Sequence, residues 1–108
     1  MSRFVDKVRT LVADGKYAVT AHAFFKLDKE RIVFADVRGE MANAVVVEEY
    51  PEYHKGPSVL VKLNDSGGKP IHALWGLAIG TEEPAYPVTV YRPDAAKWST
   101  DFLQRRSA

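Results

Sequence analysis

Residues 72–98 constrain the fold most, because they hold two apolar runs separated by a short connection. The first run, I-H-A-L-W-G-L-A-I, is apolar at both odd and even positions, which is typical of a strand in the middle of a sheet. The second run, Y-P-V-T-V-Y-R, predicts the last strand. Pro93 and Asp94 then favour the start of a C-terminal helix that contains Trp98 and ends near Arg105.

The first part of the chain predicts three helices. Apolar residues at helical spacing indicate a helix over residues 3–15, with a glycine at its end. Thr20 is expected to cap a second helix that carries His22, Lys26 and Glu30 on one face. Its apolar side would consist of Ala23, Phe24 and Leu27. A third helix is expected over residues 33–42.

Two strands connect the helices to the C-terminal pattern. Residues 45–50 are rich in branched side chains, and residues 58–64 alternate before the turn N-D-S-G-G-K-P. The order of elements predicts one two-layer α+β domain over residues 1–108. N-terminal helices would pack on a four-stranded, mostly antiparallel sheet, and a C-terminal helix would follow.

Composition excludes several classes of protein. With 108 residues, 46% of them hydrophobic, the chain is expected to form a single core. The net charge of +1 gives no global support for binding a polyanion. The chain has no cysteine, which excludes disulfides and thiolate zinc sites and fits a reducing compartment. The charged N-terminus does not resemble a signal peptide, and no apolar run is long enough to cross a membrane, so we expect a cytoplasmic protein.

Strand alternation divides the side chains of the sheet between two faces. The face toward the helices is predicted to carry Ile71, Ala73, Trp75, Leu77, Ile79, Val88 and Val90. The other face, called the outer face below, is predicted to carry His72, Tyr91, Thr89, Lys62 and Ser58, together with the apolar Leu60, Leu74 and Ala78.

Imidazole, phenol and ammonium groups on one face can transfer a proton and stabilise charge on a phosphate. The candidate catalytic residues are therefore His72, Tyr91 and His22, and the candidate substrate-binding residues are Lys26, Lys62, Arg92 and Lys97. For each histidine the simpler interpretation is structural, as a hydrogen-bonding group within the fold. The three histidines do not have the spacing of metal ligands, so we expect no metal site and no cofactor.

Several motifs together resemble a known family. They are T-A-H-A-F-F-K-L, E-E-Y-P, P-S-V-L-V, G-K-P-I-H-A-L and T-V-Y-R-P-D-A-A-K-W. This set is similar to the bacterial domain-of-unknown-function family 4258, which is grouped by similarity with the BrnT and RelE/ParE-like toxins. The likeness spans residues 17–106, and Y-R-P-D-x-x-K-W is its most specific part.

The resemblance implies a RelE-like fold with a toxin-like core over residues 17–106, and an endoribonuclease activity that a partner protein neutralises. By motif, the residues that correspond to the family's site are His22, Lys26, His72, Tyr91 and Arg92. The chain departs from the usual pattern H-A-x-x-R-M-x-x-R-G-I. It has Lys26 and Glu30 in place of the two arginines and Arg31 in place of the glycine. The loss of both planar guanidinium groups weakens bidentate phosphate recognition.

Two hypotheses stay open at this point. The first is a metal-independent, RelE/BrnT-like endoribonuclease toxin with RNA as its substrate and an antitoxin-like protein as its partner. The second is a non-catalytic protein-interaction module on the same fold, with a homodimer as one form, which apolar residues on the outer face favour.

Overall fold

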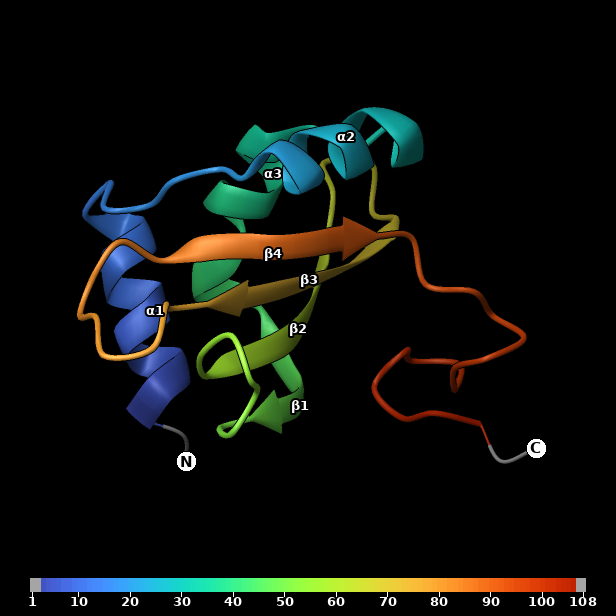
Figure 1. Ribbon diagram of the computed structural model, residues 1–108. Helices are drawn as coiled ribbons and strands as arrows, with labels where there is room; N and C mark the ends of the chain where they lie inside the picture. Colours follow the sequence, from blue (N-terminus) through green and yellow to red (C-terminus); the bar gives the residue numbers. More distant parts are fainter. Residues whose placement is uncertain (1–2, 107–108) are drawn as a thin grey trace.

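The computed structural model describes residues 3–106 and has the expected α+β architecture (Figure 1). In these residues the helical elements are α1 (Arg3–Ala13), α2 (Ala21–Glu30), α3 (Phe34–Gly39) and the short 3₁₀ helix η1 (Met41–Asn43). The strands are β1 (Val45–Tyr50), β2 (Ser58–Asn64), β3 (Pro70–Gly76) and β4 (Tyr86–Tyr91). They form one sheet in the order β1-β2-β3-β4, and every neighbouring pair is antiparallel.

The core lies between the helices and the inner face of the sheet. On α1, Val5, Val8 and Val12 are buried, as expected from their helical spacing. They belong to one cluster with strand residues such as Val61 and Trp75. The helix ends at Ala13, two residues earlier than predicted. The third predicted helix is also divided, because α3 ends at Gly39 and η1 follows.

Helix α2 packs beside β4 (Figure 1). Thr20 caps it as predicted, since its hydroxyl accepts a hydrogen bond from the Ala23 amide at 3.0 Å. The helix ends at Arg31, whose φ of 55° is the left-handed conformation that glycine adopts most easily. This geometry explains why a glycine suits the position. The expectation for Phe24 was wrong, because this side chain is 61% exposed and points away from the core.

A β-bulge in β4 changes the side-chain assignment that strict alternation predicts. The register shifts between Leu74 and Trp75, so that Trp75 pairs with Pro87 rather than with Val88. Pro87 is fully buried, whereas Val88 lines a cavity on the outer face together with Thr89. The prediction for Val88 was therefore wrong.

The long apolar run also extends beyond the strand that it predicts. Strand β3 ends at Gly76, and Leu77 is still buried. Ile79 is 67% exposed in the connection to β4, so its assignment to the core was wrong. Ala78 lies in the same connection and is exposed, so it does not belong to the outer face of the sheet.

The predicted C-terminal helix does not form. Residues 93–106, called the strap below, fold back instead through turns (Figure 1). A single turn forms where the amides of Lys97 and Trp98 donate to the Asp94 carbonyl. The chain then reverses, with the Arg106 amide bonded to the Lys97 carbonyl at 2.9 Å and Phe102 at a φ of 62°. A short helix has little stability of its own, and burial of Trp98 against the sheet overrides it.

No helix among residues 3–106 has the length and apolar character that a bilayer crossing requires.

Candidate functional site

Two rows of paired residues cross the outer face of the sheet. In one row Lys62 pairs with His72, which pairs with Tyr91. In the next row Leu60 pairs with Leu74, which pairs with Thr89. Strand alternation therefore placed His72 and Tyr91 together as expected, and their rings meet edge to face at 5.3 Å between centroids.

His72 is completely buried, although it lies on the outer face. The strap covers it, because the Trp98 ring packs edge-on against the imidazole at 4.5 Å and the Phe102 carbonyl oxygen lies 2.8 Å from Nε2. A carbonyl only accepts, so Nε2 carries the proton and Nδ1 accepts from the Tyr91 hydroxyl at 3.1 Å. Burial lowers the pKa of His72, which favours this neutral form. With both nitrogens bonded and no exposed surface, His72 does not reach a ligand in this arrangement.

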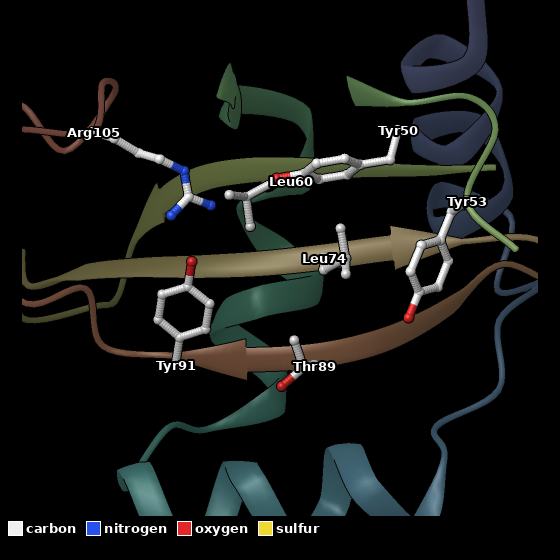
Figure 2. Close-up of a pocket in the computed structure, with 7 residues that line it drawn as sticks. All are labelled: Tyr50, Tyr53, Leu60, Leu74, Thr89, Tyr91 and Arg105. Atoms are coloured by element: carbon white, nitrogen blue, oxygen red, sulfur yellow. The ribbon is translucent and has the colours of Figure 1, made fainter. Parts of the chain in front are cut away.

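A cavity of about 220 Å³ lies beside the buried histidine. Figure 2 shows its floor of Leu60 and Leu74, with Tyr91 and Tyr53 standing on opposite sides of it. We call it the tyrosine cavity; it is lined by Tyr50, Tyr53, Leu60, Leu74, Thr89, Tyr91 and Arg105.

Polar groups around the tyrosine cavity bond mainly to one another. Arg105 of the strap donates from Nε and Nη2 to the two oxygens of Glu48, each at 3.0 Å. The Tyr50 hydroxyl also donates to Glu48. The hydrogen bond from Arg105 lowers the pKa of Glu48, and burial raises the pKa of Tyr50 and of Tyr91. Both phenols are therefore neutral, and the charge of Arg105 is balanced by Glu48.

A second cavity of about 580 Å³ adjoins the first and shares Tyr53, Leu74 and Thr89 with it. We call it the His22 cavity; its other lining residues are Thr20, His22, Lys55, Tyr86 and Val88. His22 is exposed near the start of α2, and its Nε2 lies 3.3 Å from the Thr89 hydroxyl oxygen. Among the candidates from the sequence, His22 is the histidine that solvent reaches.

The candidate cations do not gather around either cavity. Arg92 is tied to the fold, because its guanidinium pairs with Asp65 at 2.9 Å and its amide donates to Glu30 at 2.8 Å. Lys26 is half-buried on α2, and Lys97 is exposed on the strap; neither lines the two cavities. Lys62 is half-buried beside His72 and lines a separate hollow of about 120 Å³.

Tyr53 and Lys55 come from the loop between β1 and β2 and were not among the residues predicted from the sequence. Tyr50 was not predicted either, and Arg105 was expected at the end of a helix that does not form. An available signal was the aromatic and basic content of P-E-Y-H-K-G-P, which is unusual for a simple polar connection. Among residues 3–106, no group of three or more histidine or acidic side chains is placed to hold a metal ion.

Comparisons with known proteins agree with part of the sequence resemblance. A family model described as a domain of unknown function (DUF4258) matches residues 19–92. No curated protein and no solved structure matches the chain. The matched range contains His22, Lys55 and the four strands, and it leaves out α1 and the strap.

Proposed function

The chain belongs to the DUF4258 family, whose description assigns no function, and we propose that it binds single-stranded RNA on the outer sheet face and cleaves it without a metal. The proposal follows the resemblance of the sequence motifs to those of RelE/ParE-like and BrnT toxins. The protein would then be the toxin of a toxin–antitoxin pair, with an antitoxin-like protein as its partner.

The observation that carries this proposal is the accumulation of tyrosines around two adjoining cavities. Tyr50, Tyr53 and Tyr91 line one cavity, and Tyr53 and Tyr86 line the other. Aromatic side chains bind single strands because every base has a π face, and stacking contributes about 1–3 kcal/mol per base. Lys55 lines the His22 cavity and supplies a positive charge there. A local site of this kind is compatible with the small net charge of +1.

His22 is the residue that we assign to proton transfer. In its neutral form it would remove the proton from the ribose 2′-hydroxyl, whose oxygen then attacks the adjacent phosphorus. The bond to the 5′-oxygen breaks, that oxygen takes a proton from water, and a 2′,3′-cyclic phosphate remains. Lys55 lines the same cavity and would stabilise the charge that develops on the phosphate. His72 and Tyr91 would act as supports for the strap rather than as reacting groups.

A cleavage assay with three variants tests the assignment. We expect His22→Gln to lower the rate of RNA cleavage at least about 100-fold, the contribution typical of acid–base catalysis. Lys55→Gln should weaken RNA binding and reduce its dependence on salt. Lys69→Gln is the matched control for Lys55→Gln, because Lys69 is exposed in the turn between β2 and β3 and lines neither cavity. Equal cleavage by wild type and His22→Gln would contradict the assignment of His22.

A non-catalytic interaction module is the second candidate, and α2 provides the observation that favours it. Phe24 and Phe25 are 61% and 60% exposed on this helix, which is unusual for large apolar side chains. The apolar outer face supports this candidate less well, since Leu60 is buried and the tyrosines surround Leu74. Light scattering of wild type and of Phe24→Ser/Phe25→Ser decides whether these residues hold a homodimer. A monomer at all concentrations for both proteins would remove that form of the proposal.

A further inference from the structure

We propose that the tyrosine cavity is a binding site for one nucleobase, and that it selects bases with an exocyclic amino group, such as cytosine, over uracil. This inference rests on the proposed RNA binding and names the part of the substrate that this cavity takes. It concerns recognition by Tyr50, Tyr53 and Tyr91, and it does not involve the proton transfer assigned to His22.

The size and walls of the cavity fit a single flat ring. Its volume of about 220 Å³ is below the roughly 300–1,000 Å³ of pockets that enclose drug-sized ligands. It therefore accommodates one ring system rather than a whole nucleotide. Leu60 and Leu74 give it an apolar floor, and the rings of Tyr53 and Tyr91 flank that floor (Figure 2). These are the surfaces on which a base stacks.

The neighbouring cavity gives the rest of the nucleotide a place. Tyr53, Leu74 and Thr89 belong to both cavities, so the two volumes meet over the middle of β3 and β4. A nucleotide with its base between the tyrosines would extend its ribose and phosphate toward His22 and Lys55. The base site thus determines which nucleotide lies next to His22.

The hydrogen bonds around the cavity determine which base it prefers. The Tyr91 hydroxyl donates to Nδ1 of His72, and the Tyr50 hydroxyl donates to Glu48. Both protons are used within the protein. The Tyr50 oxygen also accepts from Arg105, whereas the oxygen lone pairs of Tyr91 remain as acceptors for a base. An amino group donates to such acceptors, whereas the carbonyl that uracil has at the same position does not. Both phenol pKa values are raised, so the hydroxyls keep their protons at neutral pH.

The test uses the full chain and three small ligands that share a ribose and a phosphate: cytidine 5′-monophosphate, uridine 5′-monophosphate and ribose 5-phosphate. Calorimetric titration should give a Kd for the cytidine nucleotide about tenfold lower than that for ribose 5-phosphate, as one stacked base contributes. The uridine nucleotide should bind several-fold more weakly than the cytidine nucleotide. Equal affinity of all three ligands would overturn the inference.

Two variants, with a third as their control, keep the test decisive. Leu74→Phe places a ring in the cavity and should abolish the advantage of cytidine 5′-monophosphate over ribose 5-phosphate, whereas Ile79→Phe, at an exposed site outside both cavities, should not. Tyr91→Phe keeps the ring but removes the acceptor, so it should remove the preference for cytidine over uridine. If Leu74→Phe keeps the wild-type ratio of affinities for cytidine 5′-monophosphate and ribose 5-phosphate, the base site is contradicted.

The outcomes also separate this inference from the proposed function. If RNA is bound and cleaved but Leu74→Phe has the same RNA affinity as wild type, the base site is wrong and the nuclease stands. If RNA is neither bound nor cleaved but the cytidine nucleotide binds in a manner that Leu74→Phe prevents, the nuclease is wrong and the base site stands.

Discussion

Among single residues, His72 shows how its surroundings determine what an ionisable group does. It lies in the G-K-P-I-H motif and pairs with Tyr91, so its chemistry suits proton transfer. However, the Phe102 carbonyl and the Tyr91 hydroxyl occupy both ring nitrogens, and Trp98 excludes water. In its neutral form, His72 helps to hold the strap against the sheet by donating to the Phe102 carbonyl.

This arrangement predicts that acid weakens the fold through His72. Burial lowers the pKa of His72 in the folded state below the ordinary value of about 6.5. Below that pH the unfolded chain binds a proton that the folded chain does not, so the free energy of unfolding falls as the pH falls. The stabilisation is complete above the unfolded pKa and decreases until the pH passes the folded pKa. We expect urea denaturation to show a constant free energy of unfolding well above pH ~6.5 and a loss that begins near that pH and continues below it.

The variant His72→Gln provides the control for this prediction. Its amide donates to a carbonyl and accepts from a hydroxyl, as the neutral imidazole does, but it does not titrate. Its stability should therefore change less than that of wild type over the same range. The carboxyl groups with lowered pKa values, Glu48, Asp65 and Asp101, act at lower pH, near and below their ordinary values of about 4. Parallel pH curves for the two proteins would show that His72 is not the source.

Features of the helices and strands that depend on neighbouring residues alone were predicted correctly from the sequence. The helical spacing on α1, the cap at Thr20 and the alternation in β2 each act over a few residues, and all three predictions are confirmed. The bulge at Val88 and the fold of the strap depend on contacts with distant segments. Strict alternation does not include the extra residue of the bulge, so it assigns Val88 to the wrong face. The helical propensity of the strap is outweighed by the burial of Trp98. Tyr53 could not be predicted either, because no sequence periodicity shows where the side chain of a loop residue lies.

The loop between β1 and β2 provides a prediction about an element. Gly56 is buried with a φ of 126°, and a Cβ there would lie 2.0 Å from the Leu77 carbonyl oxygen. Gly56→Ala must therefore shift the loop that carries Tyr53. We expect it to lower the free energy of unfolding by about 1–3 kcal/mol more than Gly68→Ala, since overpacking adds to the strain of a positive φ. Gly68 also has a positive φ, of 83°, but a Cβ there meets nothing within 4 Å. Equal losses in chemical denaturation of the two variants would contradict the close contact.

The whole molecule consists of a core and an attached segment, and neither coincides with the matched family range. Helix α1 lies outside residues 19–92, yet Val5, Val8 and Val12 belong to the central cluster. The strap also lies outside that range, but it packs on the opposite face through Trp98 and through the exposed pair Arg105–Glu48. The strap is therefore held by Trp98, by the hydrogen bond from His72 to the Phe102 carbonyl and by the bidentate Arg105–Glu48 pair. We therefore expect the strap to open with a smaller free energy than the core needs to unfold.

Native-state hydrogen exchange of two variants tests this separation. Val8→Ala removes two methyl groups from the core and should lower the protection of amides in β2 and β3 by about 2 kcal/mol. Strap amides such as those of Ser99 and Arg106 should keep their protection, because they exchange when the strap alone opens. Trp98→Ala should do the reverse, with a large loss in the strap and a small one in the sheet. If each variant changes both groups of amides equally, the strap and the core unfold as one unit. The His72 imidazole would then be exposed only by global unfolding, and the outer face would be permanently closed at that end.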